Sequence, residues 1–239
     1  MANIAIVSEK TSPACLQTLR ARGYTPILCP QGKRTAPPLA YHPDMHLASL
    51  GGRIFCGEDF FLENRDFFRS LHSFGKAPEI IPLPDRSGEC YPADCAYNLL
   101  TVGDAVFYNP KSIAPSLLSA AEALGYRLFP TRQGYAACTV LPLGAHYAIT
   151  ADAGMEKALP RAGIEVLKIS EGSIALPPYA HGFIGGCGGT HGNAAYFYGD
   201  IRRHPDFEAM QSFATKAGFS LIPLSEEPLC DLGGILFIE

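Results

Sequence analysis

The chain of 239 residues is long enough to bury a substantial core, and 47% hydrophobic with 18% charged residues is typical of a globular protein rather than a disordered one. The net charge of −4, with no basic run longer than residues 32–34, argues against a nucleic-acid partner, because phosphate binding needs clustered lysine and arginine. No apolar run approaches the roughly 20 residues of a membrane span. The first ten residues lack the basic and apolar regions of a signal peptide, so we expect a cytoplasmic protein without membrane contact.

The first 30 residues predict a strand, a helix and a second strand. Residues 3–8 form an apolar run, and Ser12 followed by Pro13 marks the start of a helix that ends near Gly23. A second apolar run follows at 24–30. The same order returns four more times, with helices predicted at 12–23, 63–75, 114–125, 154–163 and 204–218. Pro160 predicts that the fourth helix is short or kinked.

Each predicted helix lies between two short apolar strands, and an irregular segment follows with a shared pattern of its own. These five motif segments span 41–52, 91–104, 135–145, 183–193 and 227–234. The repeating unit is about 45 residues long, a length typical of repeat architectures. Strands that alternate with helices favour parallel crossovers, and the remaining C-terminal strand at 235–239 is free to pair with the N-terminal strand.

These repeats predict one α/β domain over residues 1–239: a five-bladed, pseudo-fivefold propeller whose ring is closed by the N- and C-terminal strands. Closure removes exposed sheet edges. Five residues occupy equivalent motif positions, and we expect their side chains to surround one axis beside a central cavity: Met45, Cys95, Cys138, Cys187 and Cys230. The glycine-rich stretch GFIGGCGGTHGN at 182–193 is then the fourth motif segment, and we expect its glycines, which lack side chains, to leave space at the central cavity.

Eight cysteines without a CxxC pair do not indicate a zinc ribbon or a small disulfide scaffold. We expect mainly buried free thiols, an interpretation that suits Cys15, Cys29 and Cys56 well.

The repeat resembles the pentein fold of the guanidino-modifying enzymes, which include arginine and agmatine deiminases, dimethylarginine hydrolases and amidinotransferases. The segment YHPDMHLASLGGRIF at 41–55 is similar to the family's His-x-Asp segment. The resemblance implies a general acid/base role for His42 and a guanidinium-binding role for Asp44.

Other family motifs match only in part. FIGGC resembles the family's Phe-Glu-Gly-Gly-Asp segment, with Ile184 and Cys187 in place of the two acids. The C-terminal Gly-Gly-x-x-Cys segment, which carries the family's nucleophile, has Phe237 at the cysteine position. The order of the motifs also differs, as a circular permutation would produce.

Other blades of a pseudo-symmetric ring can supply the missing groups. An activated nucleophile combines a thiol with a histidine base and an orienting acid. We rank Cys187 with His191, and Cys95 with His42, as the leading catalytic pairs. The candidate ligand-binding residues are Asp44, Asp94, Cys230 and Asp231.

The leading hypothesis is a protein that binds a small guanidino or amidino ligand in the central cavity, as a cysteine-dependent hydrolase or amidinotransferase. One alternative is a catalytically inactive pentein that serves as a binding or assembly factor. A second is a metal-dependent hydrolase, because His42, Asp44 and His46 at i, i+2 and i+4 would share one face of a strand. We expect no cofactor, and the sequence leaves the oligomeric state open.

Overall fold

The computed structural model describes residues 3–72 and 78–238. The strands in this part of the chain form three-stranded sheets, in which the first strand is antiparallel and the third parallel to the middle strand. The five sheets are β15–β1–β2 (Leu236–Ile238, Asn3–Ser8, Tyr24–Cys29), β3–β4–β5 (Leu47–Leu50, Arg53–Gly57, Glu79–Leu83), β6–β7–β8 (Leu100–Val102, Ala105–Tyr108, Arg127–Pro130), β9–β10–β11 (Val140–Leu143, Tyr147–Thr150, Glu165–Lys168) and β12–β13–β14 (Gly188–His191, Ala194–Phe197, Ser220–Pro223). This mixed α/β arrangement fits the predicted fivefold repeat.

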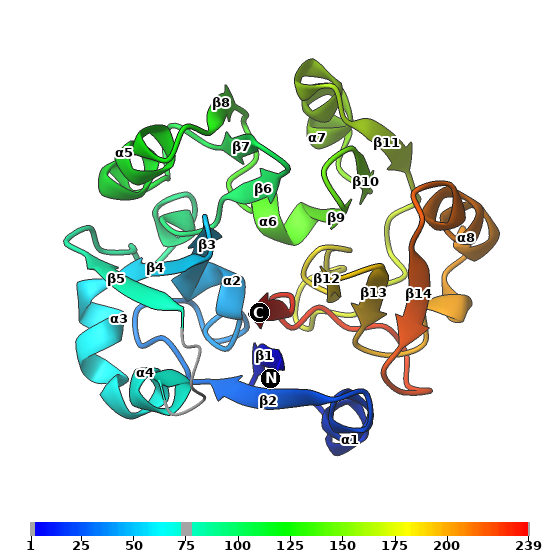
Figure 1. Cartoon of the computed structure of the whole chain (residues 1–239), viewed down its shortest axis with the longest axis horizontal. Coiled ribbons are helices and arrows are strands. Elements are labelled where there is room, and N and C mark those ends of the chain that lie inside the picture. Colours follow the sequence, from blue (N-terminus) through cyan, green and yellow to red (C-terminus); the bar gives the residue numbers. More distant parts are fainter. Residues whose placement is uncertain (1–2, 73–77, 239) are drawn as a thin grey trace.

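Helices connect the middle strand of each sheet to the third strand and lie at the periphery (Figure 1). They are α1 (Pro13–Ala21), α3 (Glu58–Glu63) with α4 (Arg65–His72), α5 (Pro115–Ala123), α7 (Ala153–Ala158) with the 3₁₀ turn η2 (Leu159–Ala162), and α8 (Phe207–Lys216), which the 3₁₀ turn η3 (Ile201–Arg203) precedes. None of the helices in the described ranges is long and apolar enough to cross a membrane.

The predicted helix signals act as expected. The Ser12 hydroxyl caps α1 by accepting a hydrogen bond from the Cys15 N–H at 3.4 Å. Pro160 lacks an N–H donor, and the chain changes from α7 to the tighter η2 at this position. The second predicted helix, 63–75, corresponds to α4, and its expected end at 73–75 lies outside the described residues. The short helix α3, which precedes it, was not predicted.

Five apolar clusters fill the spaces between neighbouring sheets. Along β1, Ile4 and Ile6 face the cluster shared with β4 and α4, whereas Ala5 and Val7 face the cluster shared with β13 and α1. This alternation follows from the period of two in a strand. Three further clusters join β4 to β7, β7 to β10, and β10 to β13. Each sheet is therefore joined to two neighbours.

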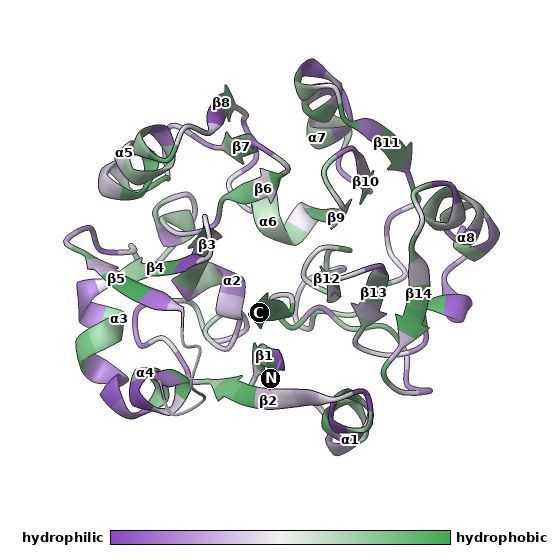
Figure 2. Cartoon of the chain, in the orientation of Figure 1, coloured by the Kyte–Doolittle hydropathy of each residue, from purple (hydrophilic) through white to green (hydrophobic). Residues whose placement is uncertain are grey.

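The two ends of the chain share one sheet, because β15 pairs with β1 in the register Ile4↔Ile238 to Ile6↔Leu236. The five sheets surround a common centre near which both chain ends lie (Figure 1). Figure 2 shows hydrophobic residues along the strands and mixed hydrophobic and hydrophilic residues on the outer helices.

The motif segments enter the centre as turns of different kinds. They include the short helix α2 (Pro43–His46), the 3₁₀ turn η1 (Ala93–Cys95) and the short helix α6 (Ala136–Thr139), while residues 184–187 form a hydrogen-bonded turn. Equivalent sequence positions therefore point in different directions, and the expected ring of five side chains is wrong. Met45 and Cys138 share a central cluster, but Cys187 packs with β10 and α8, and Cys230 packs beside the cluster of α1.

The glycines of 185–189 allow neighbouring backbones to approach the centre. A methyl group on Gly185 would collide with the carbonyl oxygens of Ala137, Cys138 and Val140, and one on Gly189 would collide with the backbone of Ile235. These glycines therefore allow close contact with the main chain of adjacent blades, and Gly185, Gly188 and Gly189 also line a central cavity, as the sequence predicts.

We expect Gly185→Ala to lower the free energy of unfolding by about 3 kcal/mol or more, because the three carbonyl oxygens belong to backbone that cannot move aside cheaply. Urea unfolding followed by circular dichroism measures this change. Gly154→Ala in α7 is the control and should stay within about 1 kcal/mol of the wild type, since alanine favours a helix. Equal stability of both variants would contradict tight backbone packing at Gly185.

Candidate functional site

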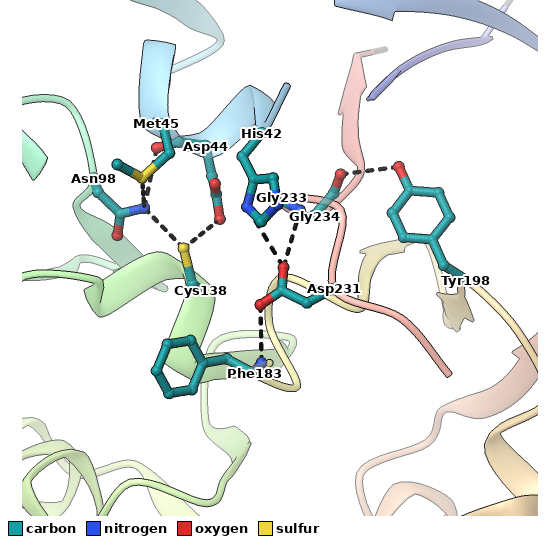
Figure 3. A network of polar contacts seen from close by, with 10 residues as sticks. All are labelled: His42, Asp44, Met45, Asn98, Cys138, Phe183, Tyr198, Asp231, Gly233 and Gly234. Atoms are coloured by element: carbon teal, nitrogen blue, oxygen red, sulfur yellow. Dashed lines mark hydrogen bonds and ion pairs between the residues drawn. The ribbon is translucent and has the colours of Figure 1, made fainter. Parts of the chain in front are cut away.

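A cysteine, an aspartate and an asparagine from three motif segments meet at the centre (Figure 3). The Cys138 thiol, on α6, donates to Oδ2 of Asp44, on α2, at 2.8 Å. The amide of Asn98 lies 3.1 Å from the Cys138 sulfur and also donates to the Asp44 carbonyl at 3.1 Å, while its oxygen accepts from the Ala137 N–H at 2.8 Å. Asn98 thus fixes α2 against α6 and holds the thiol at the carboxyl group.

A second carboxyl group arrives from the C-terminal motif segment. Asp231 is only 2% exposed and accepts hydrogen bonds from the N–H groups of Phe183 at 2.9 Å and Gly233 at 3.1 Å. Its Oδ1 lies 3.6 Å from Nδ1 of His42, which is equally buried. Figure 3 shows His42 and Asp231 beside the Asp44–Cys138 pair.

The acidic groups of the site influence one another's pKa. Burial raises the pKa of Asp44 to about 6, and burial together with the charge of Asp44 raises that of Asp231 to about 7. Burial, followed by the charges of both carboxyl groups, raises the pKa of the Cys138 thiol well above 9. Burial lowers the pKa of His42 to about 3, so its imidazole is neutral. A bound cation would therefore stabilise the ionised forms of Asp44, Asp231 and Cys138.

A cavity of about 250 Å³ opens onto these groups. Its lining combines three of them with mainly apolar side chains: Leu39, His42, Tyr135, Cys138, Leu176, Tyr179, Ala180, His181, Phe183 and Asp231. Asp44 lines a second central cavity, of about 240 Å³, walled by the first strands of all five sheets. The Asp44–Cys138 contact thus lies between the two cavities.

Two buried polar atoms at this place have no hydrogen-bond partner among the described residues: Nδ1 of His42 and Oδ1 of Asp44. Buried polar atoms are normally hydrogen-bonded, and an unpaired one indicates a position where a ligand or water binds. Both atoms belong to side chains around the thiol, so they point to the same binding site.

The expected pair of Cys187 and His191 is not formed. Cys187 is in an apolar cluster with its sulfur 3.8 Å from the Tyr198 carbonyl, whereas Nδ1 of His191 contacts the Tyr24 hydroxyl at 2.8 Å. The residues between them form the extended strand β12 rather than a turn, which separates the two Cα atoms by about 13 Å.

The Cys95–His42 pair is also absent, because each residue has another partner. The Cys95 thiol donates to Oδ1 of Asp94 at 3.3 Å, and Tyr135 donates to the other oxygen of Asp94 at 3.0 Å. Burial is the main cause of a raised pKa for Cys95. Two other thiols share a cavity with His42: Cys138 lines the larger cavity and Cys230 a smaller one.

Cys230 is partly exposed and lines a smaller cavity beside His42 and Asp231. Burial raises the pKa of its thiol to about 12. Of the predicted ligand-binding residues, the structure therefore brings Asp44 and Asp231 to the thiol of Cys138, keeps Asp94 with Cys95, and places Cys230 at an adjoining cavity.

The proposed metal set of His42, Asp44 and His46 is not assembled. Pro43 begins a helical turn instead of a strand, so positions i, i+2 and i+4 point in different directions. His46 binds the Ala40 carbonyl at 2.8 Å and stacks on Phe60. Within the described ranges, no group of three or more histidine, cysteine or acidic side chains is arranged for a metal ion.

Sequence reasoning missed Cys138 as the central thiol, together with Asn98 and Tyr135. Cys138 occupied an aligned motif position but had no acidic or histidine neighbour in the chain, which is why Cys95 and Cys187 ranked above it. Its partners come from residues 40 to more than 90 positions away.

The fold resembles that of solved pentein proteins, at low sequence identity. SxtG, an amidinotransferase from Microseira wollei in the saxitoxin biosynthetic pathway, is 12% identical over 96% of this chain and 89% of its own, with a TM-score of 0.54. A dimethylarginine dimethylaminohydrolase from Pseudomonas aeruginosa, complexed with citrulline, is 10% identical over 95% and 93%, with a TM-score of 0.51. The N-terminal domain of ArgZ, covalently bound to a reaction intermediate, is 11% identical over 99% and 97%, with a TM-score of 0.52.

The particular family is shown by the sequence itself. Residues 6–236 match the model of a family of unknown function, DUF6873, and the chain belongs to this family. No curated protein matches the sequence.

We expect Asp44→Asn to raise the melting temperature by about 3 °C at pH 8. The pKa of Asp44 is about 6 in the folded protein and lower in the unfolded chain, so its ionisation destabilises the folded state above pH 6. This cost declines as the pH falls below about 6 and is lost below about 4, where the carboxyl group becomes protonated in the unfolded chain as well, and the advantage of the variant should decline with it. Thermal unfolding of wild type and variant between pH 3 and 8 tests the effect.

Asp66→Asn is the matched control, because Asp66 is exposed and paired with Arg69 on the surface of α4. It should show no stabilisation at any pH. A destabilising effect of Asp44→Asn at pH 8 would contradict the costly ionisation of Asp44.

Proposed function

We propose that this protein binds a small planar guanidinium or amidinium cation between Asp44 and Asp231 and that Cys138 is the nucleophile that attacks it. The site would lie at the centre of a closed five-bladed α/β propeller. One observation carries the proposal: the Cys138 thiol donates to Asp44 beside a cavity that Cys138 and Asp231 line, and the charges of both carboxyl groups raise the pKa of this thiol.

A guanidinium or amidinium group fits this arrangement because it presents N–H donors in a plane at fixed angles, which suits carboxylate acceptors. Oδ1 of Asp44 is free to accept such a donor. The positive charge would offset the repulsion between Asp44 and Asp231 and lower their pKa values. It would also lower the pKa of Cys138, so the ligand itself would promote formation of the thiolate.

Oδ2 of Asp44 is placed to take the thiol proton, because it accepts the hydrogen bond of the Cys138 thiol and because the pKa of Asp44 is raised to about 6. Attack by the thiolate on the central carbon forms a carbon–sulfur bond. The departing amine then takes up the proton that Asp44 received, which leaves a thiouronium cation on Cys138. Water then adds to this carbon and releases the product and the thiol, as in a hydrolase. Addition of a second amine instead of water would give amidinotransferase chemistry.

A binding protein without turnover is the second candidate function. The raised pKa of Cys138 favours it, because the thiol is protonated at neutral pH when no ligand is present. The similarity to enzymes is a similarity of fold. In the enzyme motifs this chain has Ile184 in place of an acidic residue and Phe237 in place of the cysteine.

Alkylation by 2-chloroacetamidine and its neutral analogue 2-chloroacetamide tests the proposal. The two reagents have nearly the same shape and differ in charge, so a site for cations should favour the amidine at Cys138. We expect the amidine-to-amide rate ratio at Cys138 to exceed that at the exposed Cys90 by about tenfold, equivalent to about 1.4 kcal/mol. Mass spectrometry of tryptic peptides reports both sites in the same sample.

Asp44→Asn should reduce this ratio at Cys138 without changing the ratio at Cys90. Cys187→Ala should leave labelling of Cys138 intact and lower stability, because it truncates a packed core side chain. An equal ratio at Cys138 and Cys90 would overturn the cation site. Stabilisation by guanidinium compounds without any labelling of Cys138 would support the binding protein instead.

A further inference from the structure

The outer part of the 250 Å³ cavity differs in chemistry from its acidic inner end. Residues 170–183, between β11 and β12, carry Leu176, Tyr179 and Phe183 to its wall. This segment is held to the C-terminal motif segment, since the Ala175 N–H donates to the Leu229 carbonyl at 2.9 Å and the Asp231 N–H donates to the Ala175 carbonyl at 2.9 Å. The same backbone contacts thus position the apolar wall and the carboxyl group of Asp231.

Aromatic rings lead from the surface to the cavity. Tyr91 is 51% exposed, and its ring centroid lies 5.4 Å from that of Tyr135. Tyr135 is followed by Phe183 at 6.4 Å, and Phe183 by His181 at 6.0 Å. Rings at these spacings offer apolar faces and edges to another flat or apolar group.

Among the described residues, none that lines the outer cavity is lysine or arginine. His181 lies 3.7 Å from Glu171, so a carboxylate already stands beside this histidine. Lys10 is at the adjoining cavity of about 150 Å³, where its ammonium group stands over the ring of Tyr41 at 4.3 Å.

We infer that the ligand is a guanidine or amidine carrying an uncharged apolar or aromatic substituent, rather than a free α-amino acid that carries the same group. The inference rests on the proposed function and specifies its substrate class. An α-carboxylate in the outer cavity would lose its hydration without gaining a lysine or arginine partner, and the carboxylate of Glu171 beside His181 would repel it. An apolar substituent instead buries its surface against Tyr135, Leu176 and Phe183.

Calorimetric titration with four compounds tests this inference: guanidinium chloride, butylguanidine, phenylguanidine and L-arginine. We expect butylguanidine and phenylguanidine to bind at least about tenfold more tightly than L-arginine, although all three carry the same cationic group. Phe183→Ala should weaken phenylguanidine binding about tenfold and leave guanidinium binding unchanged. The backbone N–H of Phe183 that holds Asp231 remains in this variant. Phe219→Ala, at a different cavity, is the matched control and should change neither affinity.

L-arginine binding as tight as that of phenylguanidine would overturn the inference while the proposed function stands. If Lys10→Gln then removed the binding of L-arginine, the adjoining cavity would be identified as a carboxylate site. Absence of binding by every compound, including the guanidinium ion, would overturn the proposed function and the inference together. Equal losses in Phe183→Ala and Phe219→Ala would also contradict the apolar wall as the determinant of specificity.

Discussion

The antiparallel pairing of β15 with β1 is the interaction on which both the fold and the candidate site depend. It places the two ends of the chain in one sheet and gives that sheet neighbours on both sides. It also brings the C-terminal motif segment against the first one, where the Asp44 N–H donates to the Gly233 carbonyl at 3.2 Å. Asp231 reaches His42 and Asp44 for this reason, although they are distant in the sequence.

Stability and binding chemistry are separated within this architecture. The apolar clusters between sheets bury the alternating faces of the strands and supply the favourable free energy of folding. The centre opposes folding, since it holds two carboxyl groups with raised pKa values and two buried polar atoms that make no hydrogen bond within the described part of the chain. Such a cost is common at functional sites, where a ligand supplies the missing interactions.

The resemblance of the motif at 41–55 to guanidino-modifying enzymes and the arrangement of the centre agree in part. His42 and Asp44 lie at the candidate site, but the thiol beside them belongs to α6 and not to the glycine-rich segment or the C-terminal strand. The glycines at 185–189 serve the close approach of neighbouring backbones. The same fold can therefore place a thiol and two acids at its centre from a different set of blades.

The sequence by itself determined the repeating unit, the five helical regions and the pairing of the chain ends, because caps, left-handed glycines and apolar periodicity act over short distances. It also identified His42, Asp44 and Asp231 as candidates. Only the tertiary structure decided that Cys138, not Cys187 or Cys95, meets them. That choice depends on how each motif segment turns as it enters the centre, as an α-turn, a 3₁₀ turn or an extended strand. A one-residue difference in such a turn redirects a side chain, and local sequence patterns do not record it.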